Sequence, residues 1–228
     1  MKALDFDNFS ALTFDCYGTL IDWETGAISA LRGVLSAHRF DVSDDEILGL
    51  FLEFDEDLIS GEYVPYRNIL AEIVRKFGAH FGFLPAPIEV NALAGSVPKW
   101  KPFPDTNPAL ETMRPHYKLA IISNIDDDLF AETANQLQIP FDHVITAEQV
   151  RTYKPSWKNF HEAMDRLRLP GKEILHIAEG PGEIAPVRSL GFSTAWVRRF
   201  GRSANKLVEL PDVEVPDLKS LVSLMELD

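Results

Sequence analysis

Several polar residues of reactive types lie shortly after short apolar runs that indicate strands. They are Asp15, Thr19, Ser123, Asn124, Lys154, Glu179 and Glu183. A carboxylate that is held rigidly beside an electrophilic carbon, with water excluded, is an effective nucleophile. A neighbouring ammonium group keeps that carboxylate ionised and offsets charge as a leaving group departs. We therefore expect Asp15 to attack the substrate and Lys154 to hold Asp15, while Thr19 and Ser123 donate hydrogen bonds to a carboxylate.

Each of these residues alone also has a simple structural explanation. Asp15 and Ser123 suit helix caps, Lys154 suits a solvated surface charge, and Glu183 suits the first turn of a helix. Ligands of open α/β sheets, however, bind at the carboxyl ends of the strands, and four such ends carry these groups. The pattern therefore favours one shared site, in which Glu183, with Glu179 as a further candidate, positions or deprotonates a water molecule.

Strand and helix signals alternate along most of the chain. Buried strands are predicted at 11–14, 117–122, 143–146, 174–177 and 193–197. Helices are predicted at 108–114, 127–136, 157–167 and 183–190. This alternation predicts an α/β fold, with a Rossmann-like parallel sheet covered by helices on both faces.

Residues 23–101 differ from the rest because they show helical periodicity without strand signals. Ser43 and Glu46 fit a capping box at the start of one helix. Apolar side chains at 69, 70, 73, 74 and 77 share one face of a later helix. The proline-rich stretch 98–104 indicates a stiff return linker. We therefore predict a core domain at 1–22 and 102–228 and a helical cap domain at 23–101, inserted after the first strand.

Four ordered segments carry a family resemblance. They are Phe14-Asp15-Cys16-Tyr17-Gly18-Thr19-Leu20, Ile122-Ser123-Asn124, Tyr153-Lys154-Pro155, and Glu179 with Glu183. In this order they resemble the four motifs of the haloacid dehalogenase superfamily, and most closely its branch of 2-haloacid dehalogenases and azetidine-carboxylate hydrolases. The resemblance covers essentially the whole chain, since an inserted helical cap is also a feature of that family.

The resemblance implies hydrolysis of a small 2-substituted carboxylic acid through an aspartyl ester at Asp15. It also implies a substrate-binding set in which Ser123, Asn124 and the backbone N–H of Cys16 hold the substrate carboxylate, with Tyr17 beside them. The cap arginine that receives the halide in this branch has no counterpart here, because the corresponding region holds Phe51 and Leu52. A leaving group bound through nitrogen is therefore an alternative to a halide.

Tyr17 separates two activities within the superfamily. The phosphatases place a second aspartate two residues after the nucleophile, and without that general acid phosphoryl transfer loses roughly 10²- to 10⁴-fold in rate. Since a halide leaves without a proton, Tyr17 favours displacement at carbon with no required cofactor. A magnesium-dependent phosphatase and a catalytically retired relative are the alternatives. If magnesium binds, its expected ligands are Asp15, Tyr17, Glu179 and Glu183.

Composition excludes several other classes of protein. The 228 residues carry a net charge of −13 and no cluster of Lys and Arg, which argues against nucleic acid as a partner. No apolar stretch approaches the roughly 20 residues that span a bilayer, and the first residues lack the basic-then-apolar pattern of a secretory signal, so we expect a cytoplasmic protein that binds no membrane. Apolar residues exposed on the cap would suit a homodimer.

The only cysteine and the histidines are not expected to act as nucleophile or base. Cys16 is the sole cysteine, which excludes an internal disulfide. Because side chains alternate along a strand, it should point away from Asp15 into the core. His176 lies inside a predicted strand, where packing is its expected role. Arg32, Arg39 and Arg67 are the nearest candidates for the missing cap arginine, but they are expected to be surface charges.

Overall fold

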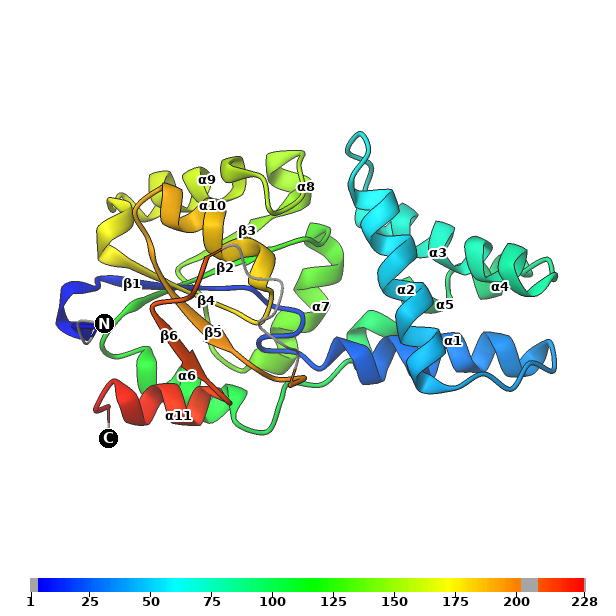
Figure 1. Cartoon of the computed structure of the whole chain (residues 1–228), viewed down its shortest axis with the longest axis horizontal. Coiled ribbons are helices and arrows are strands. Elements are labelled where there is room, and N and C mark those ends of the chain that lie inside the picture. The colour runs from blue at the N-terminus through cyan, green and yellow to red at the C-terminus, as the bar shows by residue number, and fades with distance from the viewer. Residues whose placement is uncertain (1–3, 202–208, 228) are drawn as a thin grey trace.

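A six-stranded parallel sheet forms the centre of the molecule (Figure 1). The computed structural model describes residues 4–201 and 209–227. The strands are β1 (Ala11–Phe14), β2 (Lys118–Ser123), β3 (His143–Thr146), β4 (Ile174–Ala178), β5 (Ser193–Val197) and β6 (Val213–Val215). Their order is β3-β2-β1-β4-β5-β6, and every adjacent pair is parallel. The strand that leads to Asp15 therefore lies in the interior of the sheet.

The strand positions follow from burial on both faces of the sheet. All four residues of β1 and all five of β4 are buried, as expected for continuous apolar runs in a parallel sheet. Five of the strands were predicted, although β2 lies one residue later than predicted and β4 extends one residue further. The prediction missed β6, whose three residues are too few to show a period.

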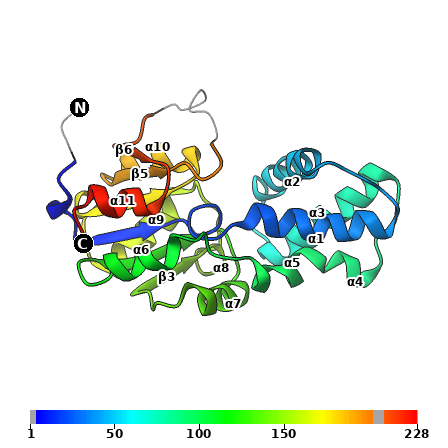
Figure 2. The same cartoon turned by 90° about the horizontal axis from the view of Figure 1, so that it is seen from below.

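Helices cover both faces of this sheet (Figures 1 and 2). They are α6 (Thr106–Met113), α7 (Asp127–Leu137), α8 (Ala147–Val150), α9 (Trp157–Leu167), α10 (Ile184–Ser189) and α11 (Leu218–Leu224). Leu12 and Phe14 of β1 belong to a buried cluster that includes side chains of α6, α7 and α11. Ala11, which points the other way, belongs to a second cluster with side chains of α9 and α10.

Two predicted helices begin at other residues than expected. Helix α6 starts two residues earlier than predicted, and its Thr106 hydroxyl donates to the Leu20 carbonyl at 2.8 Å. Helix α10 starts at Ile184, after a short 3-10 turn over Pro181–Glu183. Glu183 is therefore the residue before α10 rather than part of its first turn.

Five helices separate β1 from α6, and no strand lies between them. They are α1 (Trp23–Ala37), α2 (Asp44–Ile59), α3 (Tyr66–Phe81), α4 (Pro87–Val90) and α5 (Ala92–Ser96). We call this segment, residues 23–101, the helical insertion; it lies beyond one end of the sheet in both views (Figures 1 and 2). The Ser43 hydroxyl accepts the Glu46 N–H at 3.2 Å, so Ser43 caps α2, which is one of the two contacts of the predicted capping box. The predicted apolar face of α3 is buried.

Backbone hydrogen bonds join the helical insertion to the core. The carboxylate of Asp126, directly before α7, accepts the N–H groups of Tyr66 and Arg67, each at 2.8 Å. These are two of the N–H groups that the first turn of α3 leaves without a partner inside the helix. The Tyr153 hydroxyl donates to the Val64 carbonyl at 2.6 Å. The start of α3 is therefore fixed to the core from two sides.

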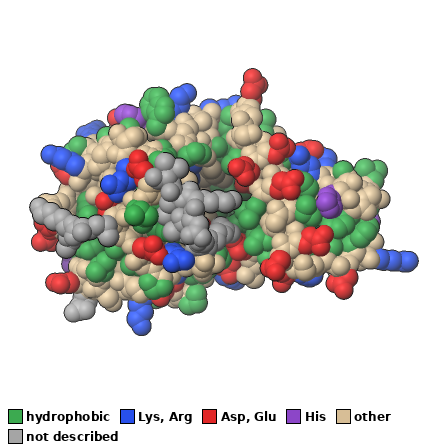
Figure 3. All heavy atoms as spheres, viewed as in Figure 1, with side chains coloured by type: hydrophobic (Ala, Val, Ile, Leu, Met, Phe, Trp, Pro, Cys, Tyr) green, Lys and Arg blue, Asp and Glu red, His purple; other side chains and the backbone are tan. Residues whose placement is uncertain are grey.

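The surface carries mixed charges. On the face seen in Figure 3, the described Lys and Arg side chains are scattered, with Asp and Glu side chains between them. This agrees with the net charge of −13. Within residues 4–201 and 209–227, no helix has the length and apolar character needed to cross a membrane.

Candidate active site

The predicted site residues meet where the strands of the sheet end. Asp15 follows β1, Ser123 is the last residue of β2, and Glu179 follows β4. Lys154 lies in the loop between α8 and α9, and Glu183 directly precedes α10. Strand β1 points toward the helical insertion in Figure 2. The site therefore lies at the edge of the sheet that the insertion faces.

The ammonium group of Lys154 lies between two carboxylates. Its Nζ donates to Asp15 Oδ1 at 2.7 Å and to Glu183 Oε1 at 3.0 Å. All three side chains are nearly removed from solvent, with exposed fractions of 4% for Lys154, 12% for Asp15 and 13% for Glu183. Charge-assisted hydrogen bonds of this length, away from water, fix the position of each group.

Thr19 orients the second oxygen of Asp15. Its hydroxyl donates to Asp15 Oδ2 at 2.9 Å and accepts the Glu179 N–H at 2.8 Å. Since the hydroxyl has one proton and accepts from the backbone, its proton is committed to Asp15. Both carboxylate oxygens of Asp15 are thus held, one by an ammonium group and one by a hydroxyl.

His176 supports Glu183 from behind. Its Nε2 lies 3.0 Å from Glu183 Oε2, and its Nδ1 lies 2.9 Å from the Thr13 hydroxyl. A neutral imidazole with its proton on Nε2 satisfies both contacts, because Thr13 can then donate to Nδ1. His176 is packed inside its strand as predicted, but its contact with Glu183 was missed. Only the register of β1 and β4, which pairs Thr13 with His176, brings the two side chains together.

The three charged groups shift one another's pKa. Burial raises the pKa of Asp15 above its usual value, and the charge of Lys154 opposes this rise. Burial also favours the neutral form of Lys154, but Asp15 and Glu183 outweigh it and raise the pKa of Lys154. For Glu183, Lys154 and His176 together outweigh burial and lower the pKa. Glu183 therefore keeps its negative charge more firmly than Asp15 does.

These groups open into one small cavity of about 220 Å³. The predicted residues that line it are Asp15, Tyr17, Ser123, Asn124, Lys154, Glu179 and Glu183. The helical insertion and its return linker contribute Trp23, Phe51, Leu52, Asp55, Tyr66 and Trp100. A volume below the roughly 300 Å³ of ordinary ligand pockets indicates a small substrate.

Two polar residues after β2 differ in their partners. The Ser123 hydroxyl is buried and has no hydrogen-bond partner among the described residues. The Asn124 amide instead bonds the backbone of Lys154, accepting its N–H at 2.7 Å and donating to its carbonyl at 3.3 Å. Ser123 is thus available to a ligand, whereas the Asn124 side chain holds the Lys154 loop.

Cys16 and Tyr17 point in different directions. Cys16 is fully buried and belongs to the same apolar cluster as Leu12 and Phe14, as its position in the alternation predicted. Tyr17 lines the cavity, and its hydroxyl lies 2.8 Å from the Thr133 hydroxyl of α7. Its ring packs edge-on against Trp100, with 5.8 Å between ring centres.

A protein-family model described as haloacid dehalogenase-like hydrolase matches residues 9–191, which include every one of these site residues. The chain is a haloacid dehalogenase-like hydrolase. The match extends from the residues before β1 to those after α10, so it includes the core motifs and the helical insertion.

This haloacid dehalogenase-like hydrolase is similar to known dehalogenases, and the similarity to those described below extends over nearly the full length of both chains. Haloacetate dehalogenase H-2 of Moraxella sp. (strain B) is 26% identical over 222 residues, 94% of this chain and 97% of the relative. The (S)-2-haloacid dehalogenase of Pseudomonas sp. (strain YL) is 25% identical over 228 residues, 96% of each chain. L-2-haloacid dehalogenase from Xanthobacter autotrophicus, solved with chloropropionic acid covalently bound, has a similar fold. Its TM-score is 0.81 at 21% identity, over 96% of this chain and 98% of that one.

The carboxylates that were expected to bind magnesium if it is present already have partners inside the protein. All four carboxylate oxygens of Asp15 and Glu183 already have a partner: Lys154 for one oxygen of each, Thr19 and His176 for the others. Among residues 4–201 and 209–227, no group of three or more His, Cys, Asp or Glu side chains could hold a metal ion.

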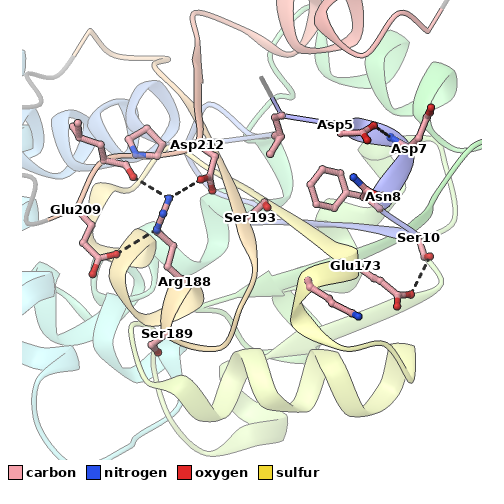
Figure 4. A pocket seen from close by; sticks show the side chains of 15 residues that line it. Asp5, Asp7, Asn8, Ser10, Glu173, Arg188, Ser189, Ser193, Glu209 and Asp212 are labelled. Atoms are coloured by element: carbon pink, nitrogen blue, oxygen red, sulfur yellow. Dashed lines mark hydrogen bonds and ion pairs between the residues drawn. The ribbon is translucent and has the colours of Figure 1, made fainter. Parts of the chain in front are cut away.

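A larger hollow lies elsewhere, at the amino ends of the strands (Figure 4). It measures about 1420 Å³ and includes Ser10, which precedes β1, and Ser193, which begins β5. Its Arg188 pairs with Asp212 at 2.8 Å and Glu209 at 3.5 Å, as Figure 4 shows. None of the predicted site residues lines this hollow, so the smaller cavity is the candidate active site.

The arginines and apolar residues of the insertion lie where the sequence indicated. Phe51 and Leu52 line the cavity. Arg32 pairs with Asp44, and Arg67 pairs with Asp128 at 2.6 Å, both on the surface. No described arginine lines the cavity. The residues that sequence reasoning missed include His176 as partner of Glu183, and Trp23, Asp55, Tyr66 and Trp100 in the wall that the insertion and its return linker contribute.

Proposed function

We propose that this protein hydrolyses a small 2-substituted carboxylic acid through an aspartyl ester at Asp15. The observation that carries the proposal is the Lys154 ammonium group, held at 2.7 Å from Asp15 Oδ1 inside a cavity of about 220 Å³. A carboxylate with this partner is held in position, and the positive charge of Lys154 favours its ionised form against the effect of burial. In the first step a carboxylate oxygen of Asp15 bonds to C2 of the substrate. The bond from C2 to the leaving group breaks, and its electron pair departs with the leaving group.

Ser123 provides a place for the substrate carboxylate. Ser123 is 2% exposed, and its hydroxyl has no hydrogen-bond partner among the described residues. It can therefore donate a hydrogen bond to that carboxylate without losing another one. A substrate that is anchored there presents C2 to the neighbouring Asp15. Asn124 acts on Lys154 through the backbone contacts of its loop.

The second step releases the product from Asp15. A water molecule attacks the ester carbonyl carbon, the 2-hydroxy acid leaves, and the carboxylate of Asp15 is restored with one oxygen from water. Glu183 is ionised and each of its oxygens has a second lone pair, so it can accept a hydrogen bond from that water. Lys154 donates to Glu183 and to one side of Asp15, where it offsets the charge that develops on the ester oxygen.

The helical insertion acts in this proposal as a cap that excludes bulk water. Trp23 and Phe51 pack together with 5.0 Å between ring centres, and both line the cavity. The reaction requires no metal ion, because Lys154 supplies the positive charge that the two carboxylates need. The named activities of the relatives support this class of substrate. A cytoplasmic location, a homodimer and the absence of nucleic acid partners stay predictions from the sequence.

Isotope labelling tests the proposal. The protein is assayed in H₂¹⁸O, with EDTA present, against 2-haloacids, azetidine-2-carboxylate and phosphate esters. The peptide that contains Asp15 is then analysed by mass spectrometry. Turnover of a 2-substituted acid with ¹⁸O in Asp15 after several cycles is the expected result.

Two outcomes would contradict the proposal. Turnover that places ¹⁸O only in the product would show direct attack by water instead of an ester at Asp15. Phosphate-ester hydrolysis that appears only when magnesium replaces EDTA would make the protein a metal-dependent phosphatase. Asp15→Asn serves as the inactive control, since an amide cannot form the ester.

A further inference from the structure

One carboxylate of the cavity wall has no part in the proposed reaction. Asp55 lies on α2, and with Phe51 and Leu52 it forms the part of that helix that lines the cavity. Residues three and four apart share a helix face, so these side chains enter the cavity together. Asp55 thus faces the same space as Asp15 from the opposite element.

Asp55 has a neutral hydrogen-bond partner and lacks a cation. The Tyr66 hydroxyl donates to Asp55 Oδ1 at 3.0 Å. The structure shows no ion pair for Asp55 with any described residue, and none of them hydrogen-bonds to Oδ2. Burial raises the pKa of Asp55 to about 6, so the carboxylate is mostly ionised at neutral pH. A largely buried carboxylate without a cation is unfavourable unless a ligand supplies one.

The other ionisable groups of the cavity provide no free positive charge for Asp55. The acidic and basic residues that line the cavity are Asp15, Asp55, Lys154, Glu179 and Glu183; burial keeps Glu179 mostly neutral at pH 7.5, because its pKa is raised to about 8. Lys154 is already shared by Asp15 and Glu183. The wall residues from α1, α3 and the return linker are Trp23, Tyr66 and Trp100, which carry no positive charge. A simple anionic substrate would add to the surplus of negative charge, whereas a zwitterion would not.

A second group that can hold a substrate lies on the core side of the cavity. It is the Ser123 hydroxyl, which has no hydrogen-bond partner among the described residues; Ser123 is 2% exposed. A hydroxyl donor on the core and a carboxylate on the insertion suit the two ends of a small zwitterion. We propose that Asp55 is a specificity-determining residue that binds an ammonium group on the substrate, so that the preferred substrates are 2-substituted acids with a protonated amine beyond C2. This inference rests on the proposed function for the identity of the reacting carbon.

The ammonium group takes no part in the chemical step. For a 2-chloro acid, Asp15 bonds to C2 and chloride leaves with the electron pair of the C–Cl bond. Asp55 and Tyr66 act on binding alone, by pairing charge with charge in a site shielded from water. The effect is therefore expected in affinity and in kcat/KM.

Binding of unreactive analogues tests the inference without any turnover. Calorimetry at pH 7.5 compares 4-aminobutanoate with pentanoate, which has the same carboxylate and a methyl in place of the ammonium group. The native protein should bind 4-aminobutanoate at least about tenfold more tightly, as expected for a charge-assisted hydrogen bond. In Asp55→Asn this preference should disappear. A native protein that prefers pentanoate, or binds neither analogue, overturns the inference.

Asp57→Asn is the matched control. Asp57 lies on the same helix, is 64% exposed and pairs with Lys76 at 2.7 Å outside the cavity. It should keep the preference for 4-aminobutanoate. Loss of the preference in both variants would show a general charge effect and would also overturn the inference. Melting temperatures of all three proteins verify that the variants are folded.

Kinetics with 2-chloro-4-aminobutanoate and 2-chloropentanoate separate this inference from the proposed function. We expect a kcat/KM ratio of at least about ten in favour of the amino compound, which falls to near one in Asp55→Asn. Equal turnover of both compounds, with label in Asp15, would overturn the role of Asp55 and leave the ester mechanism intact. Selective binding of 4-aminobutanoate without label in Asp15 would leave the role of Asp55 intact and reject the ester mechanism.

Discussion

Lys154 lies between two carboxylates that would repel each other without it. Through Asp15 it connects to Thr19, and through Glu183 to His176 and Thr13, so that one line of hydrogen bonds crosses the ends of β1 and β4. The types and order of the motif residues were enough to predict that Asp15, Thr19, Lys154 and Glu183 belong together. They were not enough to predict His176, whose contact with Glu183 depends on strand register and on the turn before α10.

Removal of the Lys154 charge should damage both catalysis and folding. In Lys154→Gln, we expect kcat/KM to fall by about 10²- to 10³-fold, as for loss of a preorganised electrostatic donor. The free energy of unfolding should fall by about 3–5 kcal/mol, because two buried carboxylates lose their shared cation. Denaturant unfolding and steady-state kinetics measure the two effects. Lys158→Gln, at an exposed position on α9, is the control and should change neither kcat/KM nor the free energy of unfolding. A kcat/KM of Lys154→Gln within threefold of the native value would contradict the role of Lys154.

Glu179 should make stability depend on pH. Burial, with Asp15 and Glu183 nearby, raises the pKa of Glu179 from 4.5 to about 8. The folded protein therefore binds this proton more tightly than the unfolded chain, and the stabilisation is full below pH 4.5 and is lost as pH rises through about 8. The size of the effect is on the order of 5 kcal/mol.

Urea unfolding between pH 5 and pH 9 checks this expectation. Glu179→Gln cannot lose a proton, so its stability should decline less over this range than that of the native protein. Glu111→Gln, at an exposed position of α6, should follow the native curve. A parallel decline in the native protein and Glu179→Gln would show that Glu179 is not the group responsible.

At the scale of elements, α1 and the return linker shape one wall of the cavity. Trp100 packs against α1 at Gly26, where an added Cβ would lie 2.0 Å from the indole ring. Its Nε1 donates to the Ser96 hydroxyl at 3.0 Å, which fixes the ring from the other side. Periodicity predicted the helices and the linker, but such a close approach between elements leaves no periodic signal in the sequence.

A methyl group at Gly26 should therefore disturb the cavity from outside it. In Gly26→Ala, the indole of Trp100 must move, and we expect overpacking to lower the free energy of unfolding by about 1–3 kcal/mol. KM should rise because Trp100 lines the cavity. Gly33→Ala is the matched control on the same helix: nothing lies within 4 Å of its Cβ, so it should be neutral or stabilise by up to about 1 kcal/mol. Equal behaviour of the two variants would refute the packing argument.

The whole molecule is a sheet and a helical insertion that share one cavity. The sequence predicted the sheet and the helices α1 to α5, since the change from strand–helix alternation to helical periodicity falls near residue 23 and reverses near residue 101. It did not predict how they meet, because the contact between Asp126 and the start of α3 joins residues about sixty positions apart. For the same reason Asp55 and Tyr66 could not be assigned to the cavity in advance.

Loss of Asp126 should loosen the insertion from the core. In Asp126→Ala, the N–H groups of Tyr66 and Arg67 lose their acceptor, at a cost of about 1–3 kcal/mol for each group that stays buried. We expect faster proteolysis between the two parts and a higher KM, since Tyr66 lines the cavity. Asp128→Ala is the control: it removes an exposed pair with Arg67, which should contribute less than about 1 kcal/mol. Unchanged proteolysis in Asp126→Ala would contradict the proposed link.

The buried position of Cys16 makes the protein convenient for site-directed labelling. Its thiol is shielded from solvent, and burial raises its pKa well above the usual value, so maleimide dyes should leave the native protein unmodified. A reporter cysteine at Leu84, a side chain 90% exposed on the insertion, would then carry the only fluorophore. Fluorescence from that single dye could follow movement of the insertion during turnover, with the native thiol left in place.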